Sequence, residues 1–83
     1  MVDLALLTRP GCGLCEEFQT EFAAWAVGRN LPALRLQDVD SDPLLQRRYG
    51  LKIPVLLLDS VRVCATHFEP TELERLLRPR GNR

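Results

Sequence analysis

The sequence predicts an α/β fold in which a four-stranded mixed sheet carries helices on its faces. Short apolar runs alternate with segments whose apolar residues recur at helical spacing, and only two residues separate the last two runs. The predicted order is therefore β-α-β-α-β-β-α. Strand–helix–strand units are expected to join parallel strands through right-handed crossovers, whereas the final hairpin must be antiparallel. A mixed sheet satisfies both requirements.

Length and composition favour one small domain spanning residues 1–83. The 83 residues include 46% hydrophobic residues, enough for a dense core. The 11 basic and 11 acidic side chains cancel, so the charge gives no reason to expect nucleic acid or an acidic membrane as partner. Three cysteines do not suit a secreted disulfide scaffold, and the first apolar run is too short for a signal peptide or membrane span. We expect a monomer in the reducing cytoplasm.

The first strand and helix are predicted on either side of a turn. The apolar run Leu4–Thr8 is ended by Arg9-Pro10-Gly11, as a buried strand would be. From Gly13 the apolar period becomes helical, and Gly28 stands where a helix C-cap glycine would. The buried face of this helix is expected to contain Leu14, Phe18, Phe22 and Trp25 or Ala26.

A second strand and a short helix follow. Leu34 and Leu36 alternate with polar neighbours, which predicts the strand. Residues 40–43 supply N-cap side chains and a proline for a helix over residues 44–49, which Gly50 ends.

A hairpin and a helix complete the chain. The hairpin strands are predicted at Val55–Leu58 and Val61–Ala65, around Asp59-Ser60, although neither turn residue is the glycine that tight turns favour. The last helix opens at residues 69–72 and is ended by Pro79. We expect residues 79–83 to be a flexible tail.

Cys12 and Cys15 stand where the first strand gives way to the first helix. In open sheets, sites form at the carboxyl ends of parallel strands, where a helix begins. A cysteine there lies beside unpaired N–H groups and the positive end of the helix dipole, which favour the thiolate. We therefore predict that Cys12 attacks a substrate disulfide and that Cys15 resolves the mixed disulfide.

The residues alone leave two alternatives for the pair. The cysteines could be small apolar residues packed in a turn. Together with Cys64 and His67 they could also form a metal site of three cysteines and one histidine. However, 48 residues separate Cys15 from Cys64, against roughly 12–20 in common structural zinc modules. Because of this spacing we predict no metal site, and we expect Cys64 to be a small buried hydrophobe.

Ile53-Pro54 directly precedes the third predicted strand. A proline at the start of a strand can be no more than an edge marker. If its peptide bond is cis, the N–H and C=O of Ile53 turn outward. An extended peptide or a glutathione backbone could then pair with them while its sulfur meets Cys12.

Two motifs carry a family resemblance. C-G-L-C on a strand-to-helix turn, followed by D-x-D-x-x-P-x-L-x-x-x-Y-G-L-x-I-P-V-L-L-L, resembles the thioredoxin superfamily from Leu4 to about Leu77. The resemblance implies a thioredoxin fold, a cis Ile53–Pro54 bond facing the cysteines, Cys12 as nucleophile and Cys15 as resolving cysteine. The small size and the T-R-P-G-C-x-x-C-E-E opening are similar to short glutaredoxin-like proteins.

The same resemblance implies a thiol–disulfide oxidoreductase and its substrate contacts. Pro54 and the Ile53 backbone would form the substrate platform, with Gly11 beside the nucleophile. Arg9 matches the basic residue that glutaredoxins use near the glutathione carboxylate. No prosthetic group is required, and glutathione is a candidate co-substrate. The partners would be a disulfide-containing protein or a glutathione mixed disulfide, together with a reductase. A binding or adaptor module with little turnover is the alternative.

Overall fold

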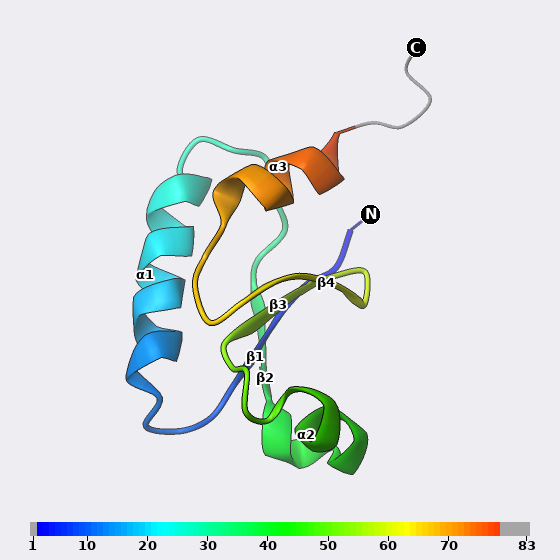
Figure 1. The fold of residues 1–83 in the computed structure, drawn as a ribbon. Coiled ribbons are helices and arrows are strands. Elements are labelled where there is room, and N and C mark those ends of the chain that lie inside the picture. The colour runs from blue at the N-terminus through cyan, green and yellow to red at the C-terminus, as the bar shows by residue number, and fades with distance from the viewer. Residues whose placement is uncertain (1, 79–83) are drawn as a thin grey trace.

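The computed structural model describes residues 2–78, so the tail expected at residues 79–83 lies outside the described residues. The helices and strands follow the predicted order (Figure 1). They are β1 (Leu4–Thr8), α1 (Gly13–Ala26), β2 (Arg35–Asp38), the short 3₁₀ helix η1 (Val39–Ser41), α2 (Pro43–Tyr49), β3 (Val55–Leu58), β4 (Val61–Ala65) and α3 (Pro70–Leu77). No helix of residues 2–78 is long and apolar enough to cross a membrane.

The four strands form one mixed sheet in the order β2-β1-β3-β4. The central strand β1 pairs in parallel with β2, with Leu6 opposite Leu36. It pairs antiparallel with β3, where Leu7 lies opposite Val55. The hairpin of β3 and β4 is antiparallel, as predicted.

The direction of β3 corrects one expectation. The unit β2-α2-β3 does not join parallel strands, because β3 runs antiparallel to β1. Both ends of the segment that contains α2 lie beside the end of β1, where Arg9 bonds Asp40 before α2 and Gly50 after it. The chain therefore leaves β2 and enters β3 at the same end of the sheet. As a result, β3 begins beside the end of β1, the end from which the chain enters α1 (Figure 1).

Helices cover both faces of the sheet. On one face, α1 and α3 pack on a core formed by Leu4, Leu6, Phe18, Phe22, Leu56, Leu58, Val63, Cys64 and Leu73. On the other face, η1 and α2 cover a smaller core of Ala5, Leu7, Val39, Val55 and Leu57. These apolar contacts fix the N-terminus of α1 against the end of β1.

The orientation of α1 corrects a second expectation. Leu14 is 42% exposed, whereas Cys15 is only 2% exposed. The buried row of the helix therefore runs through Cys15, Phe18 and Phe22. The Cys15 sulfur faces inward to meet Cys12, and Leu14, about 100° away around the helix, is turned toward solvent. Trp25 and Ala26 pack partly against the core, as predicted.

The hairpin turn achieves its shape without glycine. Asp59 and Ser60 both adopt positive φ, of 51° and 71°, which is the combination that a type I′ turn requires. The N–H of Asp59 donates to the Asp3 carbonyl at 2.9 Å, and its Oδ1 accepts from the Asp3 N–H at 2.8 Å. These two bonds tie the turn to the start of β1.

Candidate functional site

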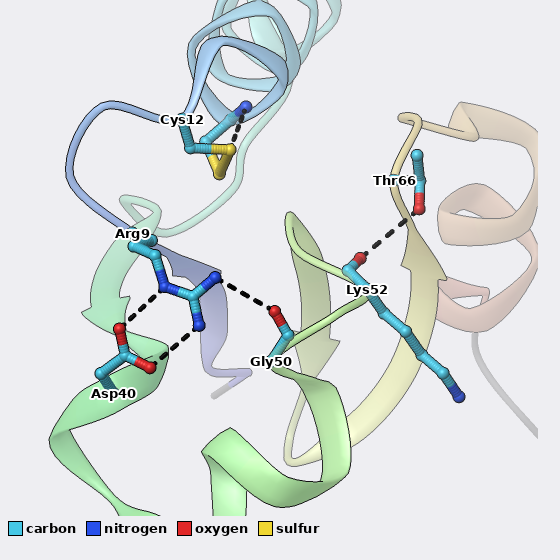
Figure 2. The surroundings of a disulfide bond; sticks show 7 residues. Arg9, Cys12, Asp40, Gly50, Lys52 and Thr66 are labelled. Atoms are coloured by element: carbon cyan, nitrogen blue, oxygen red, sulfur yellow. Dashed lines mark hydrogen bonds and ion pairs between the residues drawn. A yellow bond between two sulfur atoms is a disulfide. The ribbon is translucent and has the colours of Figure 1, made fainter.

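Cys12 and Cys15 lie at disulfide distance at the N-terminus of α1, with their Cα atoms 5.2 Å apart. Cys12 is the N-cap residue, and its Sγ accepts a hydrogen bond from the Cys15 backbone N–H at 3.1 Å (Figure 2). Cys12 is half-buried, whereas Cys15 is covered by the core. The sulfur that a partner can approach is therefore that of Cys12.

The turn between β1 and α1 positions Cys12. Its backbone N–H donates to the carbonyl oxygen of Arg9 at 3.2 Å. Gly11 has a φ of +77°, and no atom lies within 4 Å of the place that a Cβ would occupy there. Glycine is therefore favoured at residue 11 by the backbone conformation and not by lack of space.

Arg9 lies beside the disulfide in a network of its own (Figure 2). Its Nε and Nη2 donate to the two carboxylate oxygens of Asp40 at 2.8 and 2.9 Å, and its Nη1 donates to the Gly50 carbonyl at 3.2 Å. Gln46 adds a donor to Asp40 at 3.0 Å. The hydrogen bonds from Arg9, aided by Gln46, lower the pKa of Asp40 to about 2. Asp40 likewise raises the pKa of Arg9.

The segment before β3 is held by hydrogen bonds to Thr66, the residue that follows β4. The Ile53–Pro54 peptide bond is cis, and Pro54 is buried. The Pro54 carbonyl accepts the N–H of Thr66 at 2.7 Å, and Thr66 Oγ1 donates to the Lys52 carbonyl at 3.5 Å (Figure 2). Within residues 2–78, the N–H and C=O of Ile53 make no hydrogen bond. Ile53 thus presents unpaired backbone groups.

A pocket of about 250 Å³ brings four of the predicted site residues together. Arg9, Gly11, Cys12 and Cys15 are among the residues that line it. Ile53-Pro54 does not line the pocket, but the pairing of β1 with β3 places it at the same end of the sheet. A larger pocket, of about 520 Å³, runs along α2 and is lined by no cysteine.

Sequence reasoning misses the partners of Arg9. The aspartates of residues 38–42 all look like helix caps, yet their roles differ. Asp42 caps α2 and Asp38 caps η1, whereas the Asp40 side chain reaches Arg9, 31 positions away. The predicted parallel pairing of the first two strands could have indicated this contact. Arg9 follows β1 and Asp40 follows β2, and the carboxyl ends of parallel strands meet at one edge of a sheet.

Cys64 and His67 do not join the cysteine pair. Cys64 is 4% exposed within the apolar core. Burial raises the pKa of its thiol, so the thiolate that reacts and binds metals is disfavoured. Among residues 2–78, no three His, Cys, Asp or Glu side chains are grouped so that they could hold a metal ion. The alternative ligand set is not assembled.

Comparison with known proteins extends over nearly the whole chain. The family model described as glutaredoxin-like domain (DUF836) matches residues 3–78. The solution NMR structure of protein Ne2328 from Nitrosomonas europaea is similar, with a TM-score of 0.82 and 23% identity over 93% of this chain and 92% of that chain. The X-ray structure of protein XcR50 from X. campestris has a TM-score of 0.65 and 31% identity, covering 92% and 99%. No curated protein matches the chain.

Proposed function

The chain belongs to the family of glutaredoxin-like domains and has the thioredoxin fold, and from this premise we propose that it is a thiol–disulfide oxidoreductase. One observation carries the proposal. Cys12 and Cys15 lie at disulfide distance at the start of a 14-residue helix, with the first sulfur approachable and the second covered. A nucleophile and a resolving cysteine need this difference in access.

The reaction consists of two thiol–disulfide exchanges. The Cys12 thiolate attacks one sulfur of the substrate disulfide, whose S–S bond breaks, and the departing thiolate takes a proton from solvent. Cys15 then loses its thiol proton and attacks the Cys12 Sγ. The second substrate sulfur leaves as thiolate and is protonated, and the Cys12–Cys15 bond closes. Two electrons thereby pass from the protein to the substrate.

The helix favours charge on the nucleophile. The Cys15 N–H points at the Cys12 Sγ, and the positive end of the α1 dipole lies behind it. Both interactions stabilise a thiolate more than a thiol. Cys12 is therefore the attacking sulfur.

The substrate lies against the Ile53 backbone and Pro54. The unpaired N–H and C=O of Ile53 suit an extended chain that adds main-chain hydrogen bonds. Gly11 leaves the approach to Cys12 open, since no side chain stands there. Arg9 fixes the loop on which Cys12 stands, through Asp40 and Gly50.

The reaction uses no prosthetic group. Its substrates are disulfides of proteins or glutathione mixed disulfides, and a cellular reductase or glutathione restores the dithiol. The protein acts as a monomer in the cytoplasm, where thiols are kept reduced.

A paired reductase assay tests this function. One arm supplies glutathione and its reductase, and the other supplies thioredoxin reductase. We expect the protein to reduce a disulfide substrate in at least one arm, with a potential of roughly −200 to −270 mV. Cys12→Ser should abolish turnover. Cys64→Ala, which leaves the site pair intact, should retain it. A reversible disulfide without turnover in either arm would instead support the adaptor alternative.

A further inference from the structure

The charges around the disulfide pocket are unbalanced. Arg9, Glu16 and Asp38 line the pocket, and Asp40 is bonded to Arg9. Asp38 is close enough to Arg9 for its charge to raise the pKa of the guanidinium, in addition to the larger effect of Asp40. One cation therefore faces three carboxylates. The excess is local, because the whole chain has a formal net charge of zero.

Arg9 is already paired and attracts a substrate carboxylate only weakly. Three of the five N–H donors of its guanidinium make hydrogen bonds, from Nε and Nη2 to Asp40 and from Nη1 to Gly50. With its pKa held near 2, Asp40 is ionised at neutral pH. The charge of Arg9 is therefore balanced by Asp40. An incoming carboxylate would share that single positive charge with Asp40, so the pair as a whole attracts it little.

The other basic groups of this region face elsewhere. Figure 2 shows the Lys52 side chain extending away from the disulfide, while its carbonyl accepts from Thr66. Arg47 and Arg48 line the pocket along α2. Within residues 2–78, Glu16 takes part in no ion pair. The negative charge beside Cys12 is thus not neutralised by these cations.

We propose that the site selects its disulfide substrate by charge. It reacts faster with disulfides that carry cationic groups near the sulfur than with those that carry anionic groups. The inferred substrate is a protein disulfide within a lysine- or arginine-containing segment. Glutathione disulfide, with its net negative charge at neutral pH, is disfavoured. This inference rests on the proposed function, because it concerns the encounter that precedes attack by Cys12.

The size of the effect follows from Coulomb's law. A unit charge about 6–7 Å from a substrate charge changes the rate of encounter by about threefold in a water-like dielectric. Two uncompensated carboxylates, acting with opposite sign on a cationic and an anionic substrate, give a ratio of at least about tenfold at low salt. Salt should weaken this preference, since the screening length is about 10 Å at 0.1 M.

Three small disulfides provide the test. Pre-reduced full-length protein is mixed with cystamine, which is cationic, with bis(2-hydroxyethyl) disulfide, which is neutral, or with dithiodiglycolate, which is anionic. Loss of protein thiols is followed under single-turnover conditions. Each rate constant is divided by that of the uncharged dithiol dithiothreitol with the same disulfide, which removes differences in intrinsic reactivity.

Two charge-neutralising variants locate the effect. Glu16→Gln and Asp38→Asn remove one charge each, and asparagine preserves the capping oxygen at residue 38. The matched control is Glu21→Gln, which makes the same change of net charge further along α1 on an exposed position. We expect each site variant to lower the cation-to-anion ratio by about three- to tenfold, and the control to leave it unchanged.

The outcomes separate the two proposals. Faster reaction with cystamine, diminished by salt and by both site variants, supports charge selection. Equal normalised rates, a preference for dithiodiglycolate, or an equal response to Glu21→Gln overturn it while thiol–disulfide exchange itself stands. Failure to react with any of the three disulfides overturns the proposed function as well.

Discussion

The turn between β3 and β4 yields a quantitative prediction through Ser60→Gly. Ser60 has a φ of 71° and is exposed, and it makes no side-chain hydrogen bond among residues 2–78. A non-glycine residue in this left-handed region costs about 1–2 kcal/mol, which glycine avoids. Glycine loses about 0.5–1 kcal/mol more conformational entropy on folding. The difference leaves a net stabilisation of about 0.5–1 kcal/mol.

Thermal and urea unfolding measure this gain. For a domain of this size, 1 kcal/mol corresponds to about 4–8 °C, so Ser60→Gly should raise Tm by about 2–8 °C. The urea midpoint should rise without a change in slope. Far-UV circular dichroism reports both transitions.

Two further glycine variants control the reasoning. Ser41→Gly makes the same substitution where the backbone is helical and removes the 2.7 Å bond from Ser41 Oγ to the Asp38 carbonyl, so it should lower Tm. Asp59→Gly also relieves positive φ but loses the 2.8 Å bond with Asp3, so its gain should be smaller. An unchanged or lower Tm for Ser60→Gly would refute the reasoning.

Three other substitutions, one of them with a matched control, test the ion pair of Asp40 and the packing at Gly50 and Cys64. Asp40→Asn should lower Tm at neutral pH. Pairing with Arg9 lowers the Asp40 pKa from 3.8 to about 2. The contribution of the ionised Asp40 to stability is therefore fully present above pH 3.8 and is lost as pH falls toward 2. A Tm difference between Asp40→Asn and the unsubstituted protein that persists at pH 2 would argue against this assignment. Gly50→Ala would bring a Cβ to 2.5 Å from the Gln46 carbonyl oxygen and should cost about 1–3 kcal/mol, whereas Gly13→Ala, with nothing within 4 Å, should not lower Tm. Cys64→Ser buries a hydroxyl in the apolar core and should lower the free energy of unfolding by about 1–3 kcal/mol. Reduction of the variant should still take up two electrons per Cys12–Cys15 pair. A change in that number would show that Cys64 takes part in the redox reaction.

The order of elements could be predicted because several helix boundaries are chemically marked. Gly28 follows the C-cap of α1 with a φ of +79°, and the Asp42 side chain caps α2. These are local preferences of single residues, which act whatever the tertiary structure. Local sequence signals, the turn residues after β1 and the helical period from Gly13, also placed Cys12 and Cys15 at a strand-to-helix junction.

The errors concern long-range contacts. The direction of β3 follows from where the segment containing α2 returns to the sheet, at the end of β1 where Arg9 bonds both sides of α2, and no local pattern encodes that return. The exposure of Leu14 depends on how far α1 is rotated about its axis, and packing on the core buries the row of Cys15, Phe18 and Phe22 instead. Spacing alone fits either Leu14 or Cys15 to the row of Phe18, since both i−4 and i−3 neighbours share a helix face.

The most direct test of the proposed chemistry is to trap its intermediate. Reduced Cys15→Ser protein is exposed to bis(2-hydroxyethyl) disulfide, and the product is digested and mapped by mass spectrometry, with Cys12→Ser treated in parallel. If Cys12 attacks and Cys15 resolves, Cys15→Ser should accumulate one mixed disulfide on Cys12, and Cys12→Ser should form little. A mixed disulfide predominantly on Cys15 or Cys64, or no adduct on Cys12, would contradict the assignment of Cys12 as the nucleophile.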